Sequence, residues 1–309
     1  MSTLVSPDDR ESAHATESGP CLLMASAGEA ESRGAILVAA LLNERAGGSV
    51  VALGVAPPFP HKGSGIVSMK TASVIDGEDR RRTLAELARS LRVVPATKRW
   101  TKQAVVGMPV DRIIDAVAAW RASMIVMGLG RHRALDRVFG GETAIAVMRR
   151  SPVPVLAVPP ATERLPRHAL VAADFTSASR AAGELAAQLV ETGGVVTVAH
   201  VCAFADSTHR EGDLVDVYRT GARAKLDETV RALRQTSSVQ IESIMLEGEP
   251  ASALLAYARQ AVCDLIAVGG HELGLLDRIL LGSVRTQLVR GARCSVLIAP
   301  PRAAASDKL

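Results

Sequence analysis

Aliphatic runs alternate with amphipathic segments along most of this chain. In the carboxyl-terminal half, short runs rich in Val, Leu, Ile and Ala are typical of strands buried on both faces, and helical segments separate them. The strand-like runs lie at 168–175, 194–201, 239–248, 264–270 and 294–301. The helical segments lie at 176–193, where Thr176 or Ser177 can cap, and at 213–234, 249–262 and 283–290. Strands that alternate with helices predict a mostly parallel, doubly wound sheet of five strands.

The amino-terminal half repeats this pattern. Its strand-like runs lie at 21–28, 48–58, 98–107, 123–130 and 153–160, and its helical segments at 31–44, 82–91 and 109–122 and from residue 143. When residue n is set against residue n + 141, one register holds across the later part of both halves. The matched pairs include Gly107 with Gly248, Pro109 with Pro250, Ile125 with Ile266, Gly128 with Gly269 and Gly141 with Gly282. The chain therefore contains an internal repeat and consists of two similar domains.

This repeat defines the predicted organisation as two tandem doubly wound α/β domains. We place the first domain at 20–160, a short linker at 161–167 and the second domain at 168–302. Residues 1–19 are expected to be a disordered tail, and 303–309 a second tail.

Composition narrows the classes of partner. Hydrophobic residues make up 48% of the 309 residues and aromatic residues only 3%, so the cores must be built from aliphatic side chains. The formal net charge of +4 is dispersed along the chain, which does not predict a nucleic-acid partner. The four cysteines lie far apart and predict no metal site. Without an apolar signal segment or a run long enough to span a bilayer, the expected location is the cytoplasm, with no membrane contact.

Candidate chemistry lies where the strands end, because ligands of doubly wound sheets bind at the carboxyl ends of the strands. In the second half these positions hold Asp174, His200 with Val201, and the segment 269–284. The segments that carry the pattern are VAADFTSAS (171–179), VAHV (198–201), DLIAVGG (264–270), LLDRILLGSV (275–284) and CSVLIAP (294–300).

These segments resemble the universal stress protein domain, and the repeat resembles the tandem members of that family. The resemblance implies binding of an adenine nucleotide, ATP, in the second half. Asp174 would contact the nucleoside, the main chain at Val201 would meet the adenine, and glycines together with Ser283 would meet the phosphates. The nucleotide-binding residues implied in this way are Asp174, Val201, Gly269, Gly270, Gly282, Ser283 and Val284.

Both halves depart from the family's loop pattern. Glu272 stands where the family's second loop glycine belongs, so binding and loss of binding both stay open, and Mg²⁺ could bridge this carboxylate to phosphate. In the first half Ser26 stands near the position of the Asp, Arg131 replaces the loop glycine, and Glu142 replaces the hydroxyl residue. Arg131–Arg133 could bind an anion or form a solvated basic loop. We expect the first half to be mainly structural.

The resulting hypothesis is a nucleotide-responsive stress-response module that signals through protein contacts. We expect no enzyme activity and name no catalytic residue, and His200 is expected to be a hydrogen-bonded structural residue. One alternative is a nucleotide-free scaffold, and another is a slow ATPase. The resemblance also implies that the last strands, 153–160 and 294–301, which are candidates for unpaired sheet edges, pair with each other in an internal pseudo-dimer. A homodimer and an unidentified protein partner complete the predicted associations.

Overall fold

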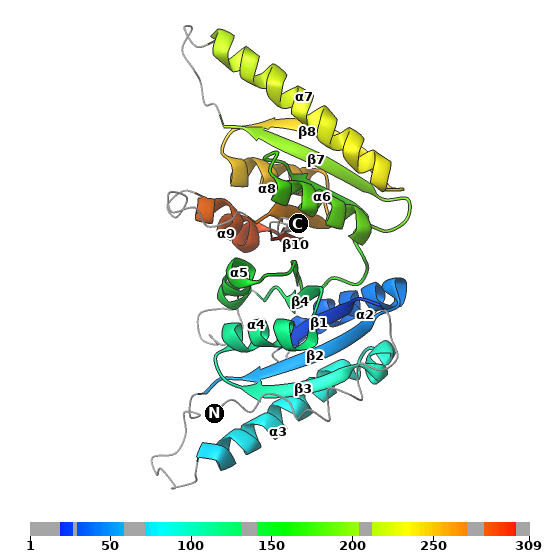
Figure 1. Ribbon diagram of the computed structural model, residues 1–309, viewed down its shortest axis with the longest axis vertical. Coiled ribbons are helices and arrows are strands. Elements are labelled where there is room, and N and C mark those ends of the chain that lie inside the picture. The colour runs from blue at the N-terminus through cyan, green and yellow to red at the C-terminus, as the bar shows by residue number, and fades with distance from the viewer. Residues whose placement is uncertain are drawn as a thin grey trace, which may run out of the picture.

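One continuous sheet runs through both halves of this computed structural model. Figure 1 shows the two halves stacked along the long axis of the molecule, with helices on both sides of the sheet. The structure describes residues 19–26, 30–58, 72–130, 141–203, 212–270 and 281–300.

The first half supplies five strands that are parallel to their neighbours within that half. They are β1 (Cys21–Ser26), β2 (Ser49–Ala56), β3 (Thr101–Val106), β4 (Met124–Gly128) and β5 (Val155–Val158). The α-helices are α2 (Arg33–Ala46), α3 (Ala72–Leu91), α4 (Pro109–Trp120) and α5 (Gly141–Arg150). Two 3-10 turns, η1 (Ala30–Ser32) and η2 (Pro95–Arg99), precede α2 and β3.

The second half repeats this arrangement, again with parallel neighbours. Its strands are β6 (His168–Ala172), β7 (Val195–Cys202), β8 (Gln240–Glu247), β9 (Leu265–Gly269) and β10 (Ser295–Ala299). Its helices are α6 (Ser177–Leu189), α7 (Gly212–Thr236), α8 (Pro250–Gln260) and α9 (Leu281–Gly291).

The strand order is β3-β2-β1-β4-β5-β10-β9-β6-β7-β8, so each half has the 3-2-1-4-5 order of a doubly wound fold. The predicted pair of tandem α/β domains is confirmed. Buried side chains of α2, α3, α6 and α7 pack on one face of the sheet, and those of α4, α5, α8 and α9 pack on the other.

Most element boundaries lie within one or two residues of the prediction, and Thr176 caps α6 as expected by accepting a hydrogen bond from Ser179 N. Two predictions at the starts of elements were wrong. Helix α3 begins at Ala72, ten residues before the predicted start at Arg82. Over residues 76–82 no side chain is buried, so this stretch carries no apolar pattern. Residues 98–99, predicted to be strand, belong to η2, where the Thr97 hydroxyl donates to the carbonyl of Leu91 at 2.7 Å.

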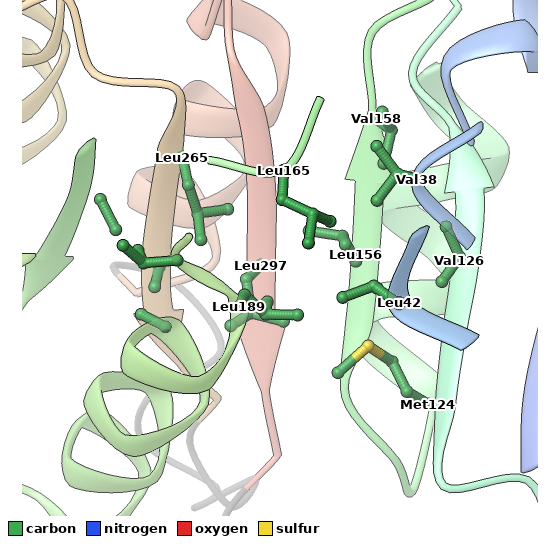
Figure 2. Packing of buried hydrophobic residues seen from close by; sticks show 14 of the residues in the cluster. Val38, Leu42, Met124, Val126, Leu156, Val158, Leu165, Leu189, Leu265 and Leu297 are labelled. Atoms are coloured by element: carbon green, nitrogen blue, oxygen red, sulfur yellow. The ribbon is translucent and has the colours of Figure 1, made fainter. Parts of the chain in front are cut away.

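The two halves meet through an antiparallel pair of last strands. Leu297 of β10 lies opposite Leu156 of β5, and Ile298 lies opposite Val155. Figure 2 shows Leu156 and Leu297 in one apolar layer with Leu189 and the linker residue Leu165. Burying a leucine fully stabilises the fold by about 1.5–3 kcal/mol. The predicted pairing of the last strands of the two halves is confirmed.

Helix ends reinforce this contact on one face of the sheet. Arg45, in the last turn of α2, donates through its guanidinium to the carbonyl oxygens of Gln188, Leu189 and Val190 at the end of α6. These carbonyls have no partner within their own helix, and a cation at the carboxyl terminus of a helix also interacts favourably with the helix dipole. The first half thus caps a helix of the second.

Candidate functional site

The carboxyl ends of three neighbouring strands bring the predicted residues of the second half together. Ala172 of β6 pairs with Ala199 of β7 and with Val268 of β9. Extending this register by two residues places Asp174 beside Val201 on one side and Gly270 on the other. Strands β6 and β9 are also where the strand order reverses, which is where doubly wound sheets bind ligands.

Asp174 is held in place by the start of α6. Its Oδ1 accepts hydrogen bonds from the Thr176 backbone N–H at 3.0 Å and from the Thr176 hydroxyl at 2.6 Å. Thr176 in turn caps α6, so the helix start and the carboxylate are fixed together. The side chain of Asp174 is exposed, as a ligand contact requires.

Phe175, which lies between Asp174 and Thr176, has a left-handed backbone with φ of 64°, which is unfavourable for a bulky side chain. Its ring stacks on His200 with centroids 4.5 Å apart, and Lys225 lies 5.8 Å from the ring centroid. The stack supplies packing that offsets the strained turn at Asp174.

His200 faces the side of the sheet covered by α6 and α7, away from Val201. It is buried, and its ring nitrogens lie 2.8 Å from the carbonyl oxygen of Ala173 and 3.0 Å from the Tyr218 hydroxyl. Because Ala173 O can only accept, His200 Nδ1 donates this hydrogen bond, and Nε2 forms the second one with the Tyr218 hydroxyl. His200 is thus a buried, hydrogen-bonded residue, as predicted.

Two of the predicted glycines have packing reasons of their own. A Cβ on Gly269 would lie 2.4 Å from the backbone nitrogen of Ser179, so β9 can approach α6 only with glycine here. The N–H of Gly270 donates to Ala299 O, and a Cβ there would lie 2.9 Å from the same oxygen. The Gly270 N–H is thus engaged within the sheet instead of pointing to a phosphate.

The remaining predicted residues lie at the start of α9. Gly282 and Ser283 belong to its first turn, and Val284 is half-buried against the α8/α9 side of the core. Glu272 lies outside the described residues, so its effect on the site stays a prediction.

Arg285 is a residue that the sequence analysis missed. It is only partly exposed, and it stands where the first half has the fully buried Ala144. Burial, and then the cation of Arg149 on α5, lower the pKa of the Arg285 guanidinium, while Asp174 opposes that shift. The signal available in the sequence was an arginine replacing an alanine at a repeat position.

The first half lacks the polar residues of this edge. Leu23 pairs with Ile125 as Leu170 pairs with Ile266, so Leu23 corresponds to Leu170. Counting onward, Ser26 matches Ala173 and not Asp174, and the match for Asp174 is Ala27. Ser26, which was expected near the Asp position, therefore lies one residue before it, because the offset that holds late in the repeat does not hold before β3.

Glu142 has a structural partner in the other half. Its Oε1 accepts from the Arg290 guanidinium of α9 at 2.5 Å, and both side chains are exposed. The residue that replaces the family's hydroxyl thus links the halves. Arg131–Arg133 lie outside the described residues, and their anion binding stays a prediction.

Other features of the described residues add no chemistry at this edge. No group of three or more His, Cys, Asp or Glu among them could hold a metal ion, and none of their helices is long and apolar enough to cross a membrane. A cavity of about 420 Å³ lies near the linker and is lined in part by Cys263 and Cys294. Burial raises the pKa of these thiols to about 12 and about 11, so both are poor nucleophiles.

Comparison with known proteins identifies the repeat. The model of the universal stress protein family matches residues 22–159 and again 166–300. A universal stress protein of Mycolicibacterium smegmatis is 29% identical over 62% of this chain and 65% of its own length. One from Mycobacterium tuberculosis is 28% identical over 58% of this chain and 62% of its own length, so the matches span less than two thirds of these relatives.

Solved structures agree on the fold. A universal stress protein from Archaeoglobus fulgidus superposes with a TM-score of 0.63 at 20% identity and covers 92% of this chain and 97% of its own. One from Pseudomonas aeruginosa, described as putative, gives 0.57 at 16% identity over 92% of this chain and 94% of its own. At these identities the likeness concerns the fold alone.

Proposed function

Because the chain belongs to the universal stress protein family, with one domain in each half, we propose that it is a cytoplasmic, nucleotide-responsive stress-response module. In this proposal it binds one adenine nucleotide, ATP, in the second half and acts through protein contacts without catalysing a dedicated reaction. The observation that carries the proposal is the placement of an exposed, fixed Asp174 beside Val201, where the strand order reverses.

The chemistry of these two positions suits a nucleoside. An ionised carboxylate only accepts hydrogen bonds, so Asp174 can accept from the hydroxyls of a ribose. Val201 is the penultimate residue of β7 and is partly exposed, so a flat base could pack against it. Gly282 and Ser283 would then meet the phosphates.

The first half would serve as a structural partner in this scheme. It lacks the carboxylate, since Ala27 stands at that position, and its Glu142 is paired with Arg290. It also supplies β5, which covers the edge of β10. We therefore expect one nucleotide per chain.

A nucleotide-free scaffold is the second candidate, and the glycines favour it. Gly269 and Gly270 are both required by packing against Ser179 and Ala299, so their presence alone does not indicate a phosphate cradle. Under this alternative the chain would act through protein partners only.

Native mass spectrometry of the purified full chain with Mg·ATP separates these proposals. We expect one nucleotide per wild-type chain and loss of that nucleotide in Asp174→Asn. The asparagine keeps an oxygen that can accept from Thr176, so the start of α6 stays capped. Two nucleotides per chain would contradict a structural first half, and an empty wild type would favour the scaffold.

A further inference from the structure

Arg285 carries a positive charge in a partly buried position. It belongs to α9, which packs on the face of the sheet that also carries the Val201 side chain, and it is only partly exposed. Among the described residues it makes no hydrogen bond or ion pair within normal distance. A partly desolvated charge without a partner is costly, and such groups are normally paired or bound to an ion of opposite sign.

A second cation comes from the other half of the chain. Arg149, near the end of α5, donates through its Nη2 to the hydroxyl of Thr286 at 3.1 Å. This contact holds the Arg149 guanidinium against the residue next to Arg285. Burial and then repulsion by the Arg149 cation lower the pKa of Arg285, and Asp174 is the described negative group that opposes this shift.

The repeat suggests that this arrangement is not required by packing. Ala144, the counterpart of Arg285, is fully buried without any charge, and the fold of the first half is complete around it. Arg290, the counterpart of Arg149, is neutralised by Glu142. The matching partner position for Arg149 holds Ser283, which carries no charge. Among the described residues, Arg149 and Arg285 thus lack the neutralising partner that Arg290 has at the junction of the two halves.

We infer that Arg285 and Arg149 form an anion site at the junction of the two halves, and that this site takes the phosphate groups of a nucleotide or a free polyphosphate. The inference rests on the proposed function only for the nucleotide, since a free polyphosphate needs no nucleoside contact. Guanidinium groups bind phosphate oxygens through paired N–H donors, and an anion between them removes their repulsion. The first half would then contribute a residue to the site of the second.

Isothermal titration of the full chain, in a buffer free of phosphate, provides the test. The probes are sodium tripolyphosphate, ATP and adenosine. The variants are Arg285→Gln and Arg149→Gln, and the matched control is Arg290→Gln, which removes a guanidinium on the same helix that already has a partner. We expect Arg285→Gln to weaken tripolyphosphate and ATP about ten- to a hundredfold and Arg149→Gln to weaken them less. Arg290→Gln should change neither, and adenosine binding should not depend on any of the three.

The outcomes separate the two proposals. If tripolyphosphate binds with the expected dependence on the arginines while ATP gains nothing from Asp174, the anion site stands and the nucleoside site fails. If ATP binds and is lost in Asp174→Asn but is unchanged in Arg285→Gln, the anion site is overturned and the proposed function stands. If no probe binds, or if Arg290→Gln weakens binding as much as Arg285→Gln, the inference is overturned.

Thermal unfolding without ligand tests whether Arg285→Gln weakens binding only because it destabilises the fold. Since Arg285 is a partly buried cation without a described partner, Arg285→Gln should leave the melting temperature unchanged or raise it. A marked fall would indicate that Arg285 holds the fold together, and would count against the anion site.

Discussion

The helices α4 and α8 begin at matched positions of the repeat but are capped differently, which offers a test within one chain. Glu249 precedes α8 and accepts hydrogen bonds from Ala251 N at 3.2 Å and from Ser252 N at 2.7 Å. Its counterpart before α4, Met108, has nearly the same backbone angles and makes no side-chain cap. Glu249→Met should therefore destabilise the chain, and Met108→Glu should stabilise it.

The expected change in the free energy of unfolding follows from the two hydrogen bonds to Glu249 and from the exposure of its carboxylate. Losing a side-chain cap costs about 0.5–2 kcal/mol, and an exposed carboxylate screened by water belongs near the middle of that range, at about 1 kcal/mol. That corresponds to a change in melting temperature of about 2–4 °C in either direction. Differential scanning calorimetry at pH 7 measures it, with Met108→Ala as the control that should change nothing.

The pKa of Glu249 determines how the stabilisation by this cap depends on pH. Hydrogen bonds from Ser252 lower the pKa of the Glu249 carboxyl below its ordinary value of 4.5. A lowered folded-state pKa contributes stability that is present above pH 4.5 and lost as the pH falls through the folded-state pKa. The difference between wild type and Glu249→Met should therefore shrink under acid conditions. An undiminished difference there, or no gain in Met108→Glu, would refute the reasoning.

Two further changes test the packing and the backbone. Leu297→Ala removes a fully buried side chain where the two halves meet, and it should lower the free energy of unfolding by about 2–5 kcal/mol in urea titrations. The control Val217→Ala, exposed on α7, should change it by less than about 0.5 kcal/mol. Equal effects of the two changes would contradict the packing described at the junction of the halves. Val262 is 77% exposed with φ of 52°, so Val262→Gly should relieve strain and raise the free energy of unfolding by about 1 kcal/mol; a loss of stability would argue against strain at this turn.

The sequence predicted the elements well because each strand is a short aliphatic run buried on both faces. Such runs stand out from helices whose apolar positions repeat every three or four residues. The prediction failed where that contrast is absent, at the exposed first turns of α3 and at the 3-10 turn before β3. The family resemblance, together with the unpaired edge that each last strand would leave, also predicted the pairing of the last strands.

The sequence by itself thus determined the two doubly wound domains, their family and the strand ends where a ligand would bind. Only the tertiary structure decided which residues meet there. It showed that Gly269 is required by the approach of α6, that Ser26 lies one position before the match of Asp174, and that Arg149 of one half reaches Thr286 of the other, beside Arg285. Residues this far apart in the chain meet according to how strands pair across the seam and how helices pack on the sheet, and no local period of the sequence encodes that distance.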